Sequence, residues 1–193
     1  MGGASRSEAR PLRLFVALVV PGPVRELVDS AVEPIRRRYP MARWVPPQNQ
    51  HVTLKFLGAT WPRLLGWVTG AVEGVARASR PFSSRVVGLG AFPSWRRARV
   101  LWAGLDDADG RMSALAADLE RALAGQFAPE RRGFTPHLTV ARFDPPVELD
   151  ASLVRGREPA SEAFPVDRVV LFRSYLRRPA PVYEAVREFP LGD

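Results

Sequence analysis

The chain has 193 residues, of which 46% are hydrophobic and 25% are charged, with a net charge of +8 and no cysteine. This composition is typical of a soluble globular protein and excludes the disordered and fibrous classes, and the length favours one compact unit. The lack of cysteine excludes disulfides, thiolate nucleophiles and iron–sulfur clusters, and it indicates a reducing, cytoplasmic location.

The first predicted element is a strand at 12–20. Its apolar run follows several arginines and imitates the start of a signal peptide. The run is short, however, and it stops at Pro21-Gly22-Pro23 without a small-x-small cleavage site. A buried strand is therefore the better interpretation, with residues 1–10 as a disordered tail. No apolar run reaches the ~20 residues of a membrane span, so no membrane association is expected.

Apolar periodicity predicts the elements that follow. Further strands are expected at 51–57, 85–89, 99–105, 137–143, 166–174 and 182–189. Helices are expected at 23–39, 63–79 and 109–123, the first with a proline in its first turn and the last with an aspartate cap. Turn signals separate these elements without a long linker. We therefore expect residues 1–193 to form one domain that mixes strands and helices.

The basic residues are all arginine except Lys55. The planar guanidinium suits phosphate oxygens, so the positive charge is compatible with an anionic partner. The same excess also arises from a GC-rich coding sequence, and no run of charges is dense enough for a nucleic-acid-binding tail. The charge alone therefore does not show whether the protein has an anionic partner.

The only two histidines begin matching segments in two predicted strands. One segment reads His51-Val-Thr53-Leu and the other reads His137-Leu-Thr139-Val. The chain contains five threonines in all, so chance is a poor explanation of the match. Residues i and i+2 of a strand share a face, so each strand is expected to present an imidazole beside a hydroxyl. A lone histidine would favour a merely structural role, whereas the matched pair favours catalysis.

Two histidines suit in-line displacement at phosphorus. The ordinary imidazole pKa of ~6.5 allows one ring to be neutral and the other protonated near neutral pH. The neutral ring then accepts a proton from the attacking water, and the charged ring donates one to the departing oxygen. The threonine hydroxyls and a nearby arginine would hold the non-bridging oxygens.

Metal and cofactor chemistry have little support in the sequence. No acidic residue lies between Glu33 and Glu73 around the first segment, and only Asp144 is close to the second. A zinc or two-metal site would need such carboxylates. The Gly-x-Ser-x-Gly and Gly-x-x-x-x-Gly-Lys motifs are also absent from the sequence. We therefore expect catalysis without a metal or a cofactor.

At these residues the sequence resembles the two-histidine (2H) phosphoesterases. It is most similar to the bacterial and archaeal RNA 2′,3′-cyclic phosphodiesterases, formerly called 2′-5′ RNA ligases. The resemblance covers nearly the whole chain. Besides the two histidine segments, it includes Arg13-Leu-Phe15-Val-Ala-Leu, Arg43-Trp44-Val-Pro, Gly90-Ala-Phe-Pro-Ser and Pro181-Val-Tyr183-Glu.

The resemblance implies an α+β fold of two pseudo-symmetric lobes, each an antiparallel sheet backed by helices. One His-x-Thr motif per lobe would face a central cleft. The implied activity is hydrolysis of RNA 2′,3′-cyclic phosphate ends to 2′-phosphomonoesters, by a monomer whose partner is the RNA end. His51 would be the proton donor to the 3′ oxygen and His137 the proton acceptor from water, and Thr53, Thr139 and Arg142 would bind the phosphate.

Other activities remain open. A 2′-5′ RNA ligase, or a phosphodiesterase for another cyclic phosphate, would use the same two histidines. A non-catalytic RNA-end-binding module is a further alternative, but the intact threonine beside each histidine argues against it.

Two cationic residues follow the histidines. Arg142 is five places after His137, and strict alternation would turn it to the opposite face. A bulge or a strand end near Ala141 is needed to bring it into the cleft. Lys55 shares the parity of His51, but it lies ~13 Å along an extended strand and is expected at most at the rim.

Three aromatic residues are candidate platforms for the nucleobase. Phe15, Trp44 and Phe143 lie close in sequence to the segments above, and single-stranded RNA ends often stack on aromatic side chains. Core packing is expected for at least two of the three.

Overall fold

The computed structural model describes residues 10–153, 155–156, 158–178 and 180–192. Most of the predicted tail, residues 1–9, lies outside them, and Arg10 is exposed. No helix of the described ranges is long and apolar enough to cross a membrane.

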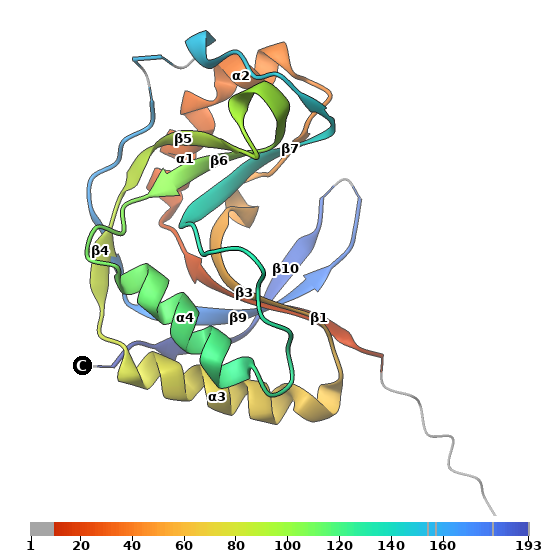
Figure 1. The fold of residues 1–193 in the computed structure, drawn as a ribbon, viewed down its shortest axis with the longest axis vertical. Helices are drawn as coiled ribbons and strands as arrows, with labels where there is room; N and C mark the ends of the chain where they lie inside the picture. Colours follow the sequence, from red (N-terminus) through yellow and green to blue (C-terminus); the bar gives the residue numbers. More distant parts are fainter. Residues whose placement is uncertain (1–9, 154, 157, 179, 193) are drawn as a thin grey trace, which may run out of the picture.

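One large antiparallel sheet dominates the described chain (Figure 1). Its strands are β1 (Leu12–Val19), β2 (Arg43–Trp44), β3 (His51–Thr60), β5 (Val86–Phe92), β6 (Ala98–Leu105), β7 (His137–Val147), β9 (Arg168–Tyr175) and β10 (Val182–Pro190). The short strands β4 (Phe82–Ser84) and β8 (Phe164–Val166) pair separately. The α+β class with antiparallel sheets is thus confirmed.

The strand order divides the large sheet into two halves. It runs β10-β9-β1-β3-β7-β6-β5, with β2 beside β7. A single residue pair, Val52 with Leu138, joins β3 to β7, whereas the neighbouring strands pair along most of their length. We call β10-β9-β1-β3 the first half and β7-β6-β5 with β2 the second half. The two sheets expected from the resemblance are therefore halves of one hydrogen-bonded sheet.

Helices cover the two halves separately (Figure 1). Helices α3 (Leu65–Ala78) and α4 (Arg111–Leu123) contact each other and strands of the first half. Helices α1 (Gly22–Ala31) and α2 (Glu33–Arg38) lie beside the second half. Four short 3-10 helices complete the described elements: η1 (Pro47–Asn49), η2 (Pro62–Leu64), η3 (Trp95–Arg97) and η4 (Ala151–Leu153).

The predicted helix at 23–39 is wrong in one respect, because it is broken at Val32. Helix α1 ends at Ala31 and α2 starts at Glu33. Pro34 lacks a backbone N–H and cannot continue the hydrogen-bond ladder of α1. The short strands β2, β4 and β8 were not predicted, because two or three residues carry too little alternation to detect.

The core is one cluster that includes buried residues of both sheet halves and of helices α1, α2, α3 and α4. Val52 and Leu54 of β3 are at most 4% exposed, as are Leu138 and Val140 of β7. They belong to one cluster with buried residues of α3 and α4. Burial of each such side chain contributes roughly 1.5–3 kcal/mol. Since these residues alternate with the histidines and threonines, the opposite face of the sheet carries His51 and His137.

Candidate active site between the two sheet halves

His51 and His137 are the first residues of β3 and β7. The pair that joins these strands, Val52 with Leu138, comes directly after the two histidines. The strands are antiparallel, so this register, continued by one residue, sets His51 opposite Thr139 and Thr53 opposite His137. The structure therefore brings together two segments that are 86 positions apart in the chain.

Both imidazoles are held in the same way. Nδ1 of His51 lies 2.8 Å from the carbonyl oxygen of Asn49, and Nδ1 of His137 lies 2.7 Å from that of Thr135. A carbonyl oxygen only accepts, so Nδ1 carries the proton in both rings. Nε2 is then the nitrogen that accepts a proton when the ring is neutral and donates one when it is charged.

Aromatic rings pack around His51. Phe15 of β1 stacks on its imidazole at 4.7 Å between centroids, and the edge of Tyr183 approaches at 5.2 Å. Phe172 of β9 stacks in turn on Phe15, with 5.2 Å between the two ring centroids. These contacts fix the imidazole plane and remove much of the ring from water.

A second aromatic group packs around His137. Phe92 meets the imidazole edge-on at 5.2 Å, and Trp102 lies at 6.1 Å. Trp102 is directly opposite Gly90 in the β5–β6 pair, and a Cβ at Gly90 would come within 2.2 Å of its indole ring. Glycine at this position therefore makes room for the indole that packs beside the histidine.

The pKa of each histidine is lowered. Burial lowers the pKa of His51 to about 4, against the opposing effect of its hydrogen bond to Asn49 and with the help of positive charge at His137 and Arg142. Burial also lowers the pKa of His137, again opposed by its backbone hydrogen bond and assisted by Arg142. Both rings of the free protein are therefore neutral at pH 7.

Each histidine strand contains a bulge at the same place. In β7, Trp102 pairs with Thr139 and the preceding Leu101 pairs with Ala141, which leaves Val140 without a partner. In β3, Ala17 pairs with Thr53 and Val16 pairs with Lys55, which leaves Leu54 without one. The extra residue is the third after the histidine in both strands, and it reverses the alternation of faces beyond it.

The bulge in β7 turns Arg142 to the histidine face. Val140 and Ala141 are both buried in succession, and Arg142 is exposed. The charge of Arg142 lowers the pKa of both histidines, in agreement with its place on their face of the sheet. Of the two alternatives expected near Ala141, a bulge and a strand end, the structure has the bulge.

The equivalent bulge in β3 makes the prediction for Lys55 wrong. Lys55 was expected at the rim of the cleft, but it is 1% exposed and faces the core. Its ammonium lies 2.7 Å from a carboxylate oxygen of Glu120 in α4 and donates to the carbonyl of Ala128 at 2.8 Å. Alternation from His51 fails here because the extra residue at Leu54 shifts the parity by one.

The candidate base platforms take other roles. Phe15 is 4% exposed and packs against His51, which leaves little of its ring for stacking on a base. Phe143 is 5% exposed and packs against Tyr39. Core packing of at least two candidates is thus confirmed. Trp44 is partly buried, with the guanidinium of Arg36 5.0 Å from its ring centre.

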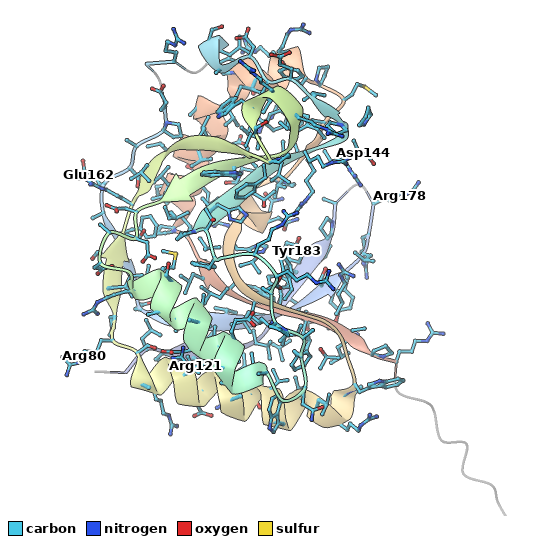
Figure 2. The ribbon with its side chains drawn as sticks, in the orientation of Figure 1. Arg80, Arg121, Asp144, Glu162, Arg178 and Tyr183 are labelled. Atoms are coloured by element: carbon cyan, nitrogen blue, oxygen red, sulfur yellow. The ribbon has the colours of Figure 1, made fainter. Side chains whose placement is uncertain are left out.

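Tyr183 is a residue of the site that the sequence does not distinguish. It lies in the segment Pro181-Val-Tyr183-Glu, and nothing in the alternation of β10 separates it from its neighbours. Figure 2 shows its side chain between the strands of the two halves. Burial raises the pKa of its hydroxyl, against the effect of nearby Arg142 and Arg13. Tyr183 thus adds a neutral phenol whose ring packs against His51.

Residues 20–177 match the model of the 2′-5′ RNA ligase superfamily. An RNA 2′,3′-cyclic phosphodiesterase of Thermus thermophilus is 33% identical over 93% of this chain and 90% of its own length. One of Aquifex aeolicus is 30% identical over 94% of this chain and 98% of its own length. One of Geobacillus stearothermophilus is also 30% identical, but the match spans 56% of that protein.

Solved structures agree in fold. TT0787 of Thermus thermophilus has a TM-score of 0.77 and 29% identity, over 94% of this chain and 100% of its own. Escherichia coli LigT complexed with 3′-AMP has a TM-score of 0.76 and 24% identity, over 95% of this chain and 99% of its own. The similarity in both chains extends across the two halves of the sheet.

Proposed function

Because the chain belongs to the 2′-5′ RNA ligase superfamily, we propose that it hydrolyses RNA 2′,3′-cyclic phosphate ends to 2′-phosphomonoesters. Relatives that carry the name RNA 2′,3′-cyclic phosphodiesterase match more than nine-tenths of this chain. The observation that supports the proposal most strongly is the pair of histidines, each held at Nδ1 by a backbone carbonyl, on strands that meet at Val52 and Leu138.

Each of the two Nε2 atoms carries out one of the two proton transfers of the reaction. His137 accepts a proton from water as the water oxygen bonds to phosphorus. The bond from phosphorus to the 3′ oxygen breaks, and His51 donates its proton to that oxygen. The products are a 3′ hydroxyl and a 2′-phosphomonoester. The proton balance is restored when His137 returns its proton to solvent and His51 takes one up.

His51 must take up the proton that it donates when the substrate binds. The pKa of about 4 in the free protein leaves this ring neutral at pH 7. A phosphate anion beside the imidazole favours its charged form and raises that pKa. Proton uptake therefore accompanies binding of the substrate, and burial strengthens the coupling because the nearby charges are poorly screened.

The phosphate oxygens are bound by groups on the histidine face. Thr53 and Thr139 stand beside the two imidazoles and donate hydroxyl hydrogen bonds. Arg142 offers a charged fork to the non-bridging oxygens, which suits the charge that develops on them in the transition state. The hydroxyl of Tyr183, held near the same cation, is a further donor to the phosphate or the ribose. No metal ion or cofactor takes part in the proposed reaction.

We further propose that the protein acts in the cytoplasm, since a chain without cysteine suits a reducing compartment. We also propose that it acts as a monomer. Size-exclusion chromatography with light scattering at micromolar concentration measures the oligomeric state directly.

The activity is tested with a short RNA that ends in a 2′,3′-cyclic phosphate, in buffer with EDTA. We expect a 2′-phosphate product, identified against 2′- and 3′-phosphate standards. An RNA fragment with a 5′ hydroxyl, added to the same reaction, reveals joining if the protein is a 2′-5′ ligase. A 3′-phosphate product would contradict the proposed regiochemistry, and loss of activity restored by a divalent ion would contradict the metal-free mechanism.

A further inference from the structure

Arg13 of β1 lies on the same face of the sheet as the histidines. Its neighbour Leu14 is 1% exposed and belongs to the core, so Arg13 and Phe15 point to the opposite face. Phe15 stacks on His51 at 4.7 Å, which identifies that face as the histidine face. Arg13 is exposed and comes two residues before Phe15, roughly 7 Å along the strand. Its guanidinium is therefore available to a ligand that extends from the histidines along β1.

The register of β9 and β10 places Arg13 on the same face. Leu14 of β1 is directly opposite Arg173 of β9. Continued by one residue, this register sets Arg13 opposite Ser174. Ser174 in turn is directly opposite Tyr183 of β10, and residues in such pairs share a face. Arg13, Ser174 and Tyr183 therefore form a row across three strands of the first half.

The charge of Arg13 acts beside the catalytic centre. Burial raises the pKa of Tyr183, and the charges of Arg142 and Arg13 oppose this rise. Burial is also the main cause of the low pKa of both histidines, and of these two cations only Arg142 adds to it. Arg142 thus suits the reacting phosphate, whereas Arg13 suits a second anion next to it.

Arg13 takes part in none of the ion pairs found among the described residues. Other arginines of the first half have partners. Arg187 lies 3.1 Å from a carboxylate oxygen of Glu73. The guanidinium of Arg173 is 4.5 Å from the ring centre of Tyr175. An exposed guanidinium that no described carboxylate engages offers its planar fork to a phosphate.

We propose that Arg13 binds the phosphodiester that joins the terminal nucleotide to the one before it, with the hydroxyl of Ser174 as a further donor. This inference rests on the proposed function, which places the cyclic phosphate between the two histidines. The internucleotide phosphate is attached to the 5′ carbon of the same ribose, so it lies next to the reacting phosphate and carries one negative charge. A guanidinium at that place strengthens binding of an RNA strand and takes no part in proton transfer.

The test compares two RNA oligonucleotides of equal length that end in a 2′,3′-cyclic phosphate. The last internucleotide linkage is an ordinary phosphodiester in the first RNA and an uncharged methylphosphonate in the second. The ribose before that linkage is 2′-O-methylated in both, so that the linkage is stable. We expect Arg13→Ala to lower kcat/KM roughly 5- to 10-fold on the first RNA, mainly through KM, and to leave the second unchanged. The wild-type protein should lose a similar factor on the second RNA.

The dependence on salt gives a second readout. The logarithm of kcat/KM on the first RNA should fall less steeply with the logarithm of the salt concentration in Arg13→Ala, with a slope smaller by about 0.7. Arg13→Lys keeps the charge and should retain most of the wild-type slope.

Arg173→Ala is the matched control, because it removes the same charge from the residue opposite Leu14, on the other face of the sheet. It should leave the ratio of kcat/KM between the two RNAs at the wild-type value. An equal loss on both RNAs in Arg13→Ala would mean that Arg13 supports the fold or the reacting phosphate, and it would overturn the inference. Unchanged kinetics on both would overturn it as well. Inactivity of the wild-type protein on both RNAs would instead refute the proposed function on which the inference rests.

Discussion

At the scale of single residues, the site depends on where each imidazole keeps its ring proton. The carbonyl of the residue two places earlier accepts from Nδ1 in both segments. This arrangement selects the tautomer without a carboxylate partner, so no negative charge raises the pKa of either ring. The result is two neutral imidazoles that respond strongly to the charge of a bound phosphate.

We predict that His51→Ala and His137→Ala each reduce kcat by at least ~100-fold, because each change removes a general acid or base. Both side chains lie on the face opposite the main core, so the fold should persist, as checked by circular dichroism and thermal melting. Turnover near the wild-type value at saturating substrate, in either variant, would refute the two-histidine mechanism.

Arg142→Ala should lower kcat/KM by roughly 100-fold, as expected for loss of a group that stabilises transition-state charge. Arg142→Lys should recover part of the loss, because it keeps the charge but not the planar fork. The pKa values of both histidines should rise in the alanine variant, since the charge of Arg142 lowers them. An NMR titration of the imidazoles measures this rise.

Arg99→Ala is the matched control for Arg142. Arg99 is an exposed arginine of β6 and directly precedes Val100, which pairs with Arg142. The side chain of Arg99 is exposed, and its charge is not among those that shift the pKa of either histidine. Equal losses in the two variants would assign the effect of Arg142 to net charge alone.

At the scale of elements, the two bulges decide which side chains reach the site. The third residue after each histidine has no paired residue on β1 or β6, so the fifth residue is on the histidine face of the sheet and the fourth faces the core. On β7 this exchange exposes Arg142 and buries Ala141, and on β3 it exposes Phe56 and buries Lys55. The buried ammonium then needs the carboxylate of Glu120, which ties β3 to α4.

Lys55→Met should destabilise the fold by about 2–3 kcal/mol, because it leaves Glu120 without its cation. This value is below that for a fully buried pair because the Glu120 side chain is 26% exposed. Urea unfolding measures the change. Since Lys55 faces away from the histidines, kcat of the folded variant should stay close to wild type.

The double variant Lys55→Met with Glu120→Leu should recover part of the lost stability, because it removes the unpaired carboxylate as well. A double variant as unstable as the single one would show that packing of the lysine stem, and not the charge pair, accounts for the loss.

At the scale of the whole molecule, the site exists only where the two halves meet. The histidines belong to different halves, which share one residue pair, and the aromatic groups around each imidazole come entirely from its own half. The protonation of one imidazole nevertheless affects the other, because positive charge at His137 lowers the pKa of His51. The two rings therefore titrate as a pair.

The dependence of kcat/KM on pH should be bell-shaped, with two apparent pKa values that belong to the pair. These values report the free enzyme, in which the pKa of both histidines is lowered from 6.5. The optimum should therefore lie on the acid side of pH 6.5. Replacing His137, the general base, should abolish the acidic limb of the residual activity. Replacing His51, the general acid, should abolish the alkaline limb. A rate that rises steadily from pH 5 to 10 would remove His51 from the mechanism.

Acid should destabilise the fold through His51. Its pKa falls from 6.5 to about 4 on folding, so between these values the unfolded chain binds a proton that the folded chain does not. Above pH 6.5 the ring is neutral in both states, and the free energy of unfolding has its full value. This free energy decreases as the pH falls from 6.5 toward 4. At pH 5 the loss is roughly 2 kcal/mol.

His51→Gln removes this titration. The difference in unfolding free energy between pH 7.5 and pH 5, measured with urea, should shrink by about 2 kcal/mol in the variant. An unchanged difference would show that the imidazole titrates normally in the folded protein.

The sequence by itself determined the α+β class, most strands and helices, and the two histidine segments. These features are local, because they depend on apolar period, turn residues and spacing within a few positions. The same locality explains the errors. Pro34 divides a helix whose apolar pattern continues across it, and strands of two or three residues leave no periodic signal.

Only the tertiary structure decided which side chains share the face of the histidines. The faces of Lys55, Phe56 and Arg142 depend on one unpaired residue in each strand, and that residue exists only relative to the partner strand. Burial of Phe15 and the approach of Tyr183 depend on neighbours that are distant in the chain. Strand register and packing are non-local, so spacing within a segment identifies the histidines but not the residues that surround them.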